Sequence, residues 1–282
     1  MIGQLTIVGL GLVGGSVAKA ARAEGVARTI VAVGRDAARL EAARRDGAVD
    51  RVTTDLAAGL RGADFVLLAA PVDAIATMLT AVWRAAASDA TLTDVGSAKA
   101  VIVREADRLA AERRLGFVGS HPMAGSEQSG YAVARADLFR GATVIVTPTE
   151  RTDAAAAKRV TQFWESLGAR VAILEAERHD RIVAAISHLP HLVAYALVSA
   201  VARLDGEALE LAARGFKDTT RIAAADARVW RDIFLQNREA IGETLAAFRA
   251  ALAELEARMG AGDGAALERE LARISAVRER LA

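Results

Sequence analysis

The feature that most constrains the fold is a glycine-rich turn close to the start of the chain. The run Gly-Leu-Gly-Leu-Val-Gly follows an apolar stretch typical of a buried strand and opens a stretch typical of a helix. Its first glycine permits a tight turn, its second lets the backbone approach a pyrophosphate, and its third allows close packing of helix on strand. The N–H groups at the helix start face such an anion. This context predicts a dinucleotide site that includes Gly9, Leu10, Gly11, Leu12, Val13 and Gly14.

Short apolar runs alternate with amphipathic stretches up to residue 174. The runs predict strands over 5–8, 29–33, 65–69, 91–95, 143–147 and 170–174. The stretches between them predict helices over 13–24, 37–45, 72–87, 98–113 and 152–167. Strands that alternate with crossover helices predict an α/β domain over 1–174, a doubly wound parallel sheet of the Rossmann type.

From residue 175 the pattern is helical only and predicts an all-α domain over 175–282. A long helix is predicted over 179–204, with a kink near Pro190 because proline removes an internal hydrogen bond. Apolar residues from Ile241 to Met259 recur with 4-3-4-3-4 spacing, which is typical of a helix–helix seam. Glycines at 260–264 break this helix, and a second stripe runs to Leu281. The stripes serve packing within one chain or a homodimer, and both alternatives stay open.

The composition excludes several classes of protein. The 282 residues suit two domains, and a net charge of +1 argues against a nucleic-acid surface. The absence of cysteine excludes disulfides and thiolate metal sites. The apolar segment 182–204 contains His188, Pro190, His191 and Arg203, so we expect a buried core helix rather than a membrane span. The first strand begins at residue 4 without a signal-peptide pattern, which favours the cytoplasm.

The end of the second strand bears on the choice of cofactor. NAD sites usually place a carboxylate there to bind the ribose 2′-hydroxyl, but this position is Gly34 and the next residue is Arg35. An arginine without a competing carboxylate can pair with a 2′-phosphate, so NADP is favoured. The competing interpretation is that Asp36 reaches the ribose and that NAD is accepted as well. Ala70 and Pro71, which follow the strand over 65–69, complete the predicted cofactor contacts.

Four further motifs follow the glycine turn: Gly-Ser-x-Lys at 96–99, Gly-x-His-Pro-Met-Ala-Gly at 119–125, Ser-His-Leu-Pro-His at 187–191 and Gly-Phe-x-Asp-x-Thr-Arg at 215–221. In this order they resemble the prephenate/arogenate dehydrogenase family over essentially the whole chain. The resemblance implies a Rossmann domain followed by a helical domain that builds a dimer. It also implies oxidative decarboxylation of prephenate or arogenate, with hydride transfer to NAD(P)⁺, in tyrosine biosynthesis. The two substrates differ only in a keto versus an amino group, so both stay open.

The resemblance assigns the catalytic roles. Loss of hydride and CO₂ makes the substrate ring aromatic, so the protein has chiefly to position the ring and polarise its hydroxyl, for which a neutral imidazole is suited. The resemblance gives this role to His121; the alternative is a histidine that only bonds backbone in a Gly-Pro turn. It gives Ser97 the role of orienting the hydroxyl and the histidine, beside a possible helix cap. Lys99 is predicted to be an anion contact or a purely structural residue.

The substrate carboxylates require a fixed guanidinium, and the resemblance assigns this role to Arg221. His191 matches a histidine of the substrate pocket, and His188 lies one turn away. No third ligand accompanies the pair and the reaction needs no Lewis acid, so no metal is expected. His179 has no matching role and is predicted to be ordinary surface. The remaining predicted pocket residues flank the site, with helix capping as the alternative for the two acids: Ser126, Glu127 and Asp218.

Two rival functions remain to be weighed. β-Hydroxyacid and imine reductases also join a Rossmann half to a helical half, but they lack the segment at 119–125. A non-catalytic dinucleotide-sensing protein would not need His121 and Arg221 together. No chorismate mutase or ACT domain fits the pattern, so a monofunctional enzyme is expected, with any tyrosine feedback acting through the active site.

Overall fold

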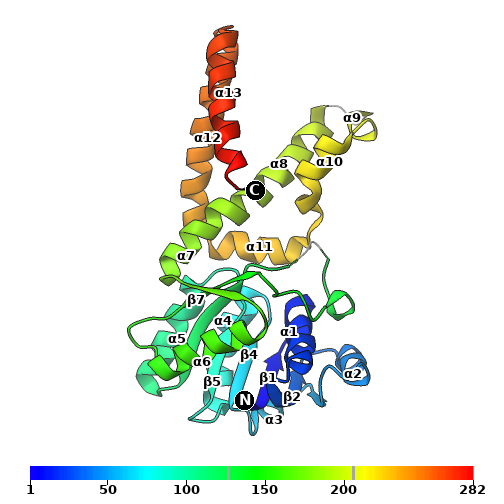
Figure 1. Cartoon of the computed structure of the whole chain (residues 1–282), viewed down its shortest axis with the longest axis vertical. Helices are drawn as coiled ribbons and strands as arrows, with labels where there is room; N and C mark the ends of the chain where they lie inside the picture. The colour runs from blue at the N-terminus through cyan, green and yellow to red at the C-terminus, as the bar shows by residue number, and fades with distance from the viewer. Residues whose placement is uncertain (126–127, 205–206, 282) are drawn as a thin grey trace. The chain divides into compact units, whose positions relative to one another are not determined.

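The computed structural model describes residues 1–125, 128–204 and 207–281, and Figure 1 gives the order of their helices and strands. The chain divides into two compact units, Met1–Asn237 and Arg238–Ala282. The first unit contains the whole sheet and the helices that follow it as far as residue 237.

The first unit is built on one sheet, in the order β3-β2-β1-β4-β5-β6-β7-β8. Among the described residues every neighbouring pair is parallel except β6 and β7, which are antiparallel. This arrangement confirms the predicted fold class. The strands are β1 (Ile2–Val8), β2 (Ala27–Val33), β3 (Arg51–Thr53), β4 (Phe65–Leu68), β5 (Thr91–Asp94), β6 (Gly116–Pro122), β7 (Thr143–Thr147) and β8 (Arg170–Ile173).

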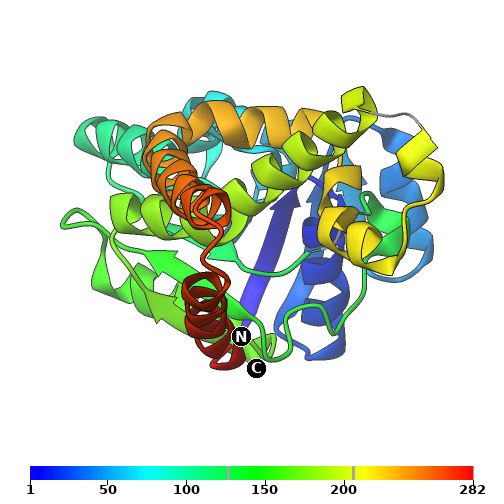
Figure 2. The same cartoon turned by 90° about the horizontal axis from the view of Figure 1, so that it is seen from above.

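The sheet is buried on both faces. Successive residues of β4 point to opposite sides: Phe65 and Leu67 belong to one apolar core, Val66 and Leu68 to the other, and all four are fully buried. Burial of one such side chain contributes about 1.5–3 kcal/mol. The helices of the first core are α1 (Leu12–Ala23), α2 (Ala37–Arg45) and α6 (Ala154–Ser166); those of the second are α3 (Leu56–Leu60), α4 (Val72–Ala85) and α5 (Ala100–Glu112). Figure 2 shows α4 and α5 on one side of the sheet and α1 and α6 on the other.

The long helix after the sheet contains a π-helical turn. It consists of α7 (Ala176–Val183), the π turn Ala184–His188 and α8 (Leu189–Leu204). Pro190 is the second residue of α8, and its ring is incompatible with the carbonyl group four residues earlier in a regular helix. A wider turn at this point accommodates the proline, and such turns are a known cause of helix kinks. The structure therefore has a π turn at the position where the sequence predicted a kink.

The apolar helix is not buried within the single chain. Ala176–Leu204 is long and apolar enough to cross a membrane by length and composition, but only 22% of its most apolar window is buried. The expectation of a buried core helix is therefore wrong for one chain. Within the first unit α10 (Arg214–Thr220) and the 3₁₀ turn η3 (Arg221–Ala224) pack against α8 and cover only part of it. The unit also contains α9 (Glu207–Glu210), the turn η1 (Tyr131–Val133) and α11 (Ala227–Gln236).

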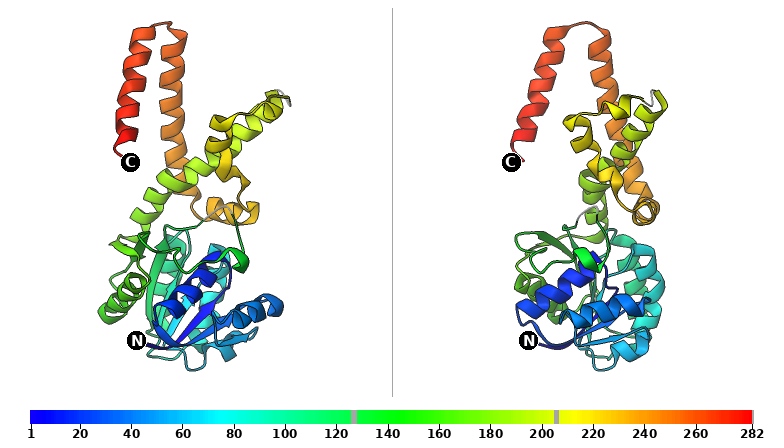
Figure 3. Two further views of the ribbon diagram at one scale, coloured as in Figure 1. Left: turned by 45° about the vertical axis from the view of Figure 1, so that its right-hand side comes forward. Right: turned by 90° about the vertical axis from the view of Figure 1, so that its right-hand side faces the viewer.

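The second unit is a pair of helices. α12 (Arg238–Gly260) and α13 (Gly264–Glu279) run side by side in opposite directions, as both views in Figure 3 show. This confirms the predicted break at 260–264. Large apolar side chains remain exposed on both helices, among them Leu252 (54%), Met259 (67%) and Leu271 (51%). The stripes are therefore only partly covered by the pairing of these two helices.

Candidate active site

The glycine turn joins β1 to α1, and its three glycines have different physical roles. Gly9 has φ +101°, and a Cβ atom there would lie 2.3 Å from the carbonyl oxygen of Ala69. A Cβ atom on Gly14 would lie 2.1 Å from the carbonyl oxygen of Gly9, whereas one on Gly11 would meet nothing within 4 Å. The first and third glycines are thus required by space within the protein, and the second leaves open space beside the helix start.

This turn lies where the strand order reverses. β1 pairs with β2 on one side and β4 on the other, and open sheets of this type bind dinucleotides at such a point. The N–H of Ala69 donates to Val8 (2.7 Å), so Ala70 and Pro71 follow directly beside the turn. Within the described residues, α1 has no side-chain cap and no acidic residue in its first turn. An uncapped helix start suits a pyrophosphate, so the residues present fit a dinucleotide.

The carboxylate at the end of β2 is engaged in a helix cap. Asp36 accepts hydrogen bonds from the N–H groups of Ala38 (3.0 Å) and Arg39 (3.1 Å), and it pairs with the Arg39 side chain (3.0 Å). Gly34 contributes no side chain. Arg35 is exposed and has no hydrogen-bond or ion-pair partner within the described part of the chain. The arrangement leaves a guanidinium, rather than a carboxylate, available at this strand end.

His121 lies at the carboxyl end of β6 and is 9% exposed. β1, β4, β5 and β6 are parallel neighbours, so His121 and the glycine turn occupy the same edge of the sheet. Beyond Val118 the strand continues by antiparallel pairing with β7, in which His121 is opposite Ile145. β6 was not among the predicted strands.

A buried ion pair holds the backbone just before His121. The Lys99 ammonium is fully buried and donates to the Asp94 carboxylate and to the carbonyl oxygen of Ser120 (2.9 Å). Asp94 also accepts from the N–H of Ser120 (3.1 Å). Burial lowers the pKa of Lys99, and Asp94 acts in the opposite direction. Of the two roles predicted for Lys99, the structural one is favoured, because this ammonium is unexposed and bonded within the protein.

Ser97 is not the helix cap that its position suggested as an alternative. α5 begins at Ala100 with Lys99 as the cap residue, and Ser97 is half-buried in the preceding turn. The helix start is capped instead from α7: the Asp180 carboxylate accepts from the N–H groups of Lys99 (2.7 Å) and Ala100 (2.9 Å). Ser97 lacks this competing role, and its predicted part in orienting the substrate stays a prediction.

The imidazole of His121 is bonded to a second imidazole. Its Nδ1 lies 2.9 Å from Nε2 of His179, and Nδ1 of His179 lies 2.7 Å from Oδ1 of Asp180. The two rings meet edge to face, with centroids 5.1 Å apart. The prediction that His179 is ordinary surface is wrong, since its side chain is fully buried. A residue without a recognised motif is placed here by the packing of α7 against the sheet.

Burial keeps these histidines neutral. It is the main cause that holds the pKa of His121 well below 6.5, and His179 and Lys99 act in the same direction. Burial also lowers the pKa of His179, against the opposing hydrogen bond to Asp180. For Asp180 burial would raise the pKa, but hydrogen bonds from His179, Lys99 and Ala100 lower it overall. A neutral imidazole pair therefore ends on an ionised carboxylate.

The motif at 187–191 supplies the next part of the site. His188 is 1% exposed, its Nδ1 lies 3.1 Å from the Asn237 amide nitrogen, and burial lowers its pKa to about 4. Asn237 also donates to the carbonyl oxygen of Asp180 (2.8 Å). His191 is half-buried and donates from Nδ1 to the Ser187 carbonyl (2.9 Å). Its ring stacks on that of Trp230, with the ring centroids 3.4 Å apart.

Arg221 is connected to this group by electrostatics. Burial is the main cause that lowers the pKa of His191, and Arg221 lowers it further. His191 acts likewise on His188, and His188 on His121. Hydrogen bonds and ring contacts join His121 to His191, and Arg221 is close enough to His191 to lower its pKa. Asp218 is exposed on α10 and pairs with Arg214 (3.2 Å).

Predicted and unpredicted residues meet in this group. Ser126 and Glu127 lie outside the described residues. His179, Asp180, Asn237 and Trp230 were not predicted. The chain has only four histidines, three of them in motifs. That rarity was the one signal that could have singled out His179.

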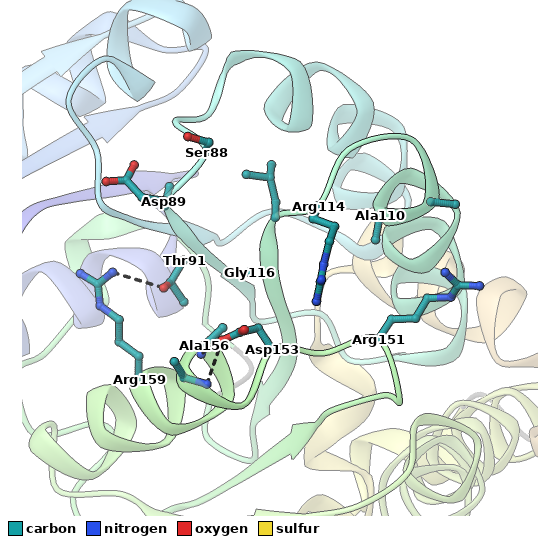
Figure 4. A pocket seen from close by; sticks show the side chains of 14 residues that line it. Ser88, Asp89, Thr91, Ala110, Arg114, Gly116, Arg151, Asp153, Ala156 and Arg159 are labelled. Atoms are coloured by element: carbon teal, nitrogen blue, oxygen red, sulfur yellow. Dashed lines mark hydrogen bonds between the residues drawn. The ribbon is translucent and has the colours of Figure 1, made fainter.

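A surface cleft of about 790 Å³ lies away from this site (Figure 4). It is lined by the first residues of β5 and β6, Thr91 and Gly116, and therefore lies at the amino-terminal edge of the sheet, opposite His121. Arg159 in its wall donates to Thr91 (3.2 Å) and pairs with Asp64 (3.1 Å), so it is committed to the fold. The cleft is not part of the candidate active site.

Comparison with known proteins covers both halves of the chain. A family model described as "Prephenate dehydrogenase, nucleotide-binding domain" matches residues 17–173, and one described as "Prephenate dehydrogenase, dimerization domain" matches residues 175–273. A cyclohexadienyl dehydrogenase of Zymomonas mobilis is 34% identical over 265 residues, which are 93% of this chain and 90% of that protein.

Solved structures are similar over the same extent. A prephenate dehydrogenase of Aquifex aeolicus, in complex with hydroxyphenyl propionate and NAD⁺, has a TM-score of 0.95 and 34% identity, covering 100% of this chain and 99% of that one. The arogenate dehydrogenase of Synechocystis has a TM-score of 0.84 and 30% identity, covering 99% of this chain and 100% of that one.

Proposed function

Because the chain belongs to the prephenate dehydrogenase family, we propose that it oxidatively decarboxylates prephenate, arogenate or both, with hydride transfer to a nicotinamide dinucleotide, in tyrosine biosynthesis. The structural observation that carries the proposal is that the glycine turn and His121 share one edge of the sheet. Rival functions as another Rossmann-plus-helical reductase or as a sensing protein are not favoured.

The residues of the site divide the work. His121 accepts the proton of the ring hydroxyl, and Ser97 orients that hydroxyl and the imidazole. When bound, the nicotinamide accepts the hydride that leaves the carbinol carbon. Arg221 binds a substrate carboxylate with its planar guanidinium group. His191 and His188 also contribute to the substrate pocket. Ser126, Glu127 and Asp218 are proposed to border the pocket.

We infer that the cofactor is NADP in preference to NAD. Asp36 is engaged in capping α2, and Arg35 beside Gly34 is placed to pair with a 2′-phosphate. Use of NAD as well remains the competing proposal. The contacts are proposed to come from residues 9–14, from Gly34 and Arg35, and from Ala70 and Pro71.

We further propose a division into a dinucleotide-binding domain, 1–174, and a helical domain, 175–282, that builds a homodimer. Support comes from the family description of a dimerization domain and from the apolar helix Ala176–Leu204, of which only 22% of the most apolar window is buried in one chain. Association of two copies would cover such a surface. The proposed location is the cytoplasm, as for a soluble biosynthetic enzyme.

The decisive experiment is steady-state kinetics with prephenate and arogenate, each with NAD and with NADP. Turnover of either substrate supports the proposal, and cofactor binding with turnover of neither substrate would overturn it. Arg221→Ala should chiefly raise KM, because it removes binding that substrate and transition state share. An effect on kcat alone would contradict the role given to Arg221.

A further inference from the structure

We propose that His179 and Asp180 are positioning residues for His121: Asp180 fixes the tautomer of His179, and His179 fixes that of His121, so that the unprotonated Nε2 of His121 is the base. The inference rests on the proposed function for the identity of the reaction. It adds two residues to which no motif assigned a role.

The geometry gives the direction of each hydrogen bond. An ionised carboxylate can only accept, so the 2.7 Å contact with Asp180 requires a proton on Nδ1 of His179. A neutral His179 then has an unprotonated Nε2, which accepts from Nδ1 of His121 across 2.9 Å. A neutral His121 with its proton on Nδ1 has an unprotonated Nε2. The pKa directions of all three groups agree with this assignment.

Asp180 is itself held rigidly, which is what a positioning residue requires. Its carboxylate accepts the N–H groups of Lys99 and Ala100 at the start of α5, in addition to His179. Its backbone carbonyl accepts from Asn237. The same carboxylate thus fixes both the helix start that follows Ser97 and the imidazole pair. One anchor sets the relative position of two segments that carry the chemistry.

The charged surroundings make this anchor necessary. Lys99, His179 and His188 all act to lower the pKa of His121, in the same direction as burial. When His121 takes the hydroxyl proton it becomes a buried cation close to the Lys99 ammonium. Asp94 is paired with Lys99, so Asp180 is the carboxylate connected to His121 through hydrogen bonds. Through His179 it stabilises the imidazolium that forms in the transition state.

The proton balance of the step closes within the site. Nε2 of His121 takes the proton of the ring hydroxyl. The carbinol carbon that bears this hydroxyl loses its hydride to the oxidised nicotinamide, and the C–O group becomes a carbonyl. The ring carboxylate then departs as CO₂, and its bond electrons make the ring aromatic with a phenolate oxygen. His121 returns the proton to that oxygen, and its neutral Nδ1–H tautomer is restored. Neither His179 nor Asp180 changes its net protonation.

The kinetic test compares three variants of the full chain. We expect Asp180→Asn and His179→Leu to lower kcat by about 10–100-fold with little change in KM, since they act on the transition state. His179→Gln keeps one acceptor and one donor on a planar group, so it should recover part of the lost kcat. Removal of the anion should also shift the acid limb of the kcat profile to lower pH, which a merely structural role would not do.

Asp64→Asn is the matched control. Asp64 also accepts two backbone N–H groups, those of Gly3 and Gln4 (3.0 Å each), and also has a lowered pKa, but it lies at the opposite edge of the sheet. It therefore measures the loss of a carboxylate that caps backbone without any link to His121. We expect its kcat and its pH profile to match those of the wild type.

A spectroscopic readout separates this inference from the proposed function. ¹⁵N-labelled imidazoles give distinct shifts for protonated and unprotonated nitrogens, and four histidines can be assigned with four single variants. We expect His121 to be protonated on Nδ1 in the wild type, and to become a mixture of tautomers in His179→Leu. A wild-type His121 protonated on Nε2, or unchanged kinetics in Asp180→Asn beside an active wild type, would overturn the inference. A wild type that turns over neither substrate would overturn the proposed function and leave the tautomer assignment standing.

Discussion

At the scale of single residues, the site depends on imidazoles that burial keeps neutral. A neutral ring accepts a proton at physiological pH, which a protonated ring cannot do. The exposed fractions of His121, His179 and His188 are 9%, 0% and 1%. Burial is the largest cause of the lowered pKa in each of them.

His121→Asn should lower kcat by about 10²–10⁴-fold, because the amide cannot accept a proton in the transition state. Cofactor affinity should stay within about twofold of the wild type, since the glycine turn is unchanged. Steady-state kinetics and a fluorescence titration of the cofactor measure the two quantities. An unchanged kcat would remove His121 from the mechanism.

Arg35→Ala should weaken NADP binding by about tenfold or more, which corresponds to about 1.4 kcal/mol for a charge-assisted contact, and should leave NAD binding nearly unchanged. Arg45→Ala, an exposed arginine at the far end of α2, is the control. Isothermal titration with both cofactors provides the comparison. Equal losses for NAD and NADP would refute pairing with the 2′-phosphate.

The buried histidines also predict an acid-sensitive fold. The pKa of His188 is about 4 in the folded chain, against 6.5 when exposed, so the unfolded state binds more protons between these values. Stability is unaffected above pH 6.5 and falls as the pH is lowered from 6.5 to 4, by up to about 3 kcal/mol for this group. Urea unfolding of wild type and His188→Asn at pH 7.5, 6 and 4.5 tests this. Parallel losses in both proteins would count against it.

The sequence predicted the local geometry of the glycine turn, but not the roles that depend on tertiary contacts. The glycine turn could be read residue by residue, because its function depends on local backbone geometry. The role of His179 could not be predicted, because its partner His121 is 58 positions away in the sequence. A local sequence pattern does not show which distant residues pack together. For Lys99 the sequence left open an anion contact or a structural role, because full burial beside Asp94 is a property of the fold.

At the scale of elements, substitutions in the glycine turn can separate a glycine that is needed for packing, Gly14, from one that leaves space for the cofactor, Gly11. Gly14→Ala should lower the free energy of unfolding by about 1–3 kcal/mol, because its Cβ would lie 2.1 Å from the Gly9 oxygen. Gly11→Ala has open space and a negative φ, so it should change stability by less than about 1 kcal/mol.

The two variants should differ again in cofactor binding. Gly11→Ala should weaken dinucleotide binding by about tenfold, because the added methyl group occupies the space where the backbone approaches the pyrophosphate. Urea unfolding and cofactor titration of both variants give the comparison. Equal stability losses in Gly11→Ala and Gly14→Ala would contradict the assignment of separate roles.

The strands that could be predicted are those with continuous apolar runs. β1, β4 and β7 consist largely of Val, Ile and Leu and are buried on both faces, which is the pattern of a parallel sheet. β6 reads Gly-Phe-Val-Gly-Ser-His-Pro, and glycine and proline are poor strand formers. It is a strand because β5 and β7 pair with it on either side. The strand that carries His121 was therefore missed, as was the three-residue β3.

At the scale of the whole molecule, the exposed apolar surface of the helices indicates that the chain associates with another chain. The most apolar 18-residue window of the helix Ala176–Leu204 has a mean hydropathy of 1.6 but is only 22% buried, and α12 and α13 also expose large apolar side chains. Soluble monomers rarely expose contiguous surface of this kind. Periodicity predicted these stripes correctly, but it could not tell whether they are covered within one chain or between two.

We expect the wild type to sediment as a dimer. Ala196 and Ala200 are exposed on α8, one turn apart, so the double substitution Ala196→Glu, Ala200→Glu would bury two charges in an interface formed there. It should weaken the dimer by at least about tenfold. Ala155→Glu, an exposed alanine of α6, is the control. Analytical ultracentrifugation over a range of concentrations decides, and a wild type that remains monomeric throughout would refute the homodimer.

The stacking of His191 on Trp230 makes the fluorescence of this tryptophan a probe of the candidate site. The other two tryptophans, Trp83 and Trp164, are 3% and 0% exposed and sit in the cores on either side of the sheet. Of the three tryptophans, all of which lie in the described part of the chain, Trp230 alone stacks on a histidine of the candidate site, His191. The fluorescence of Trp230 would therefore change when a ligand occupies the site. The fluorescence of the buried Trp83 and Trp164 would change when the nucleotide-binding half unfolds.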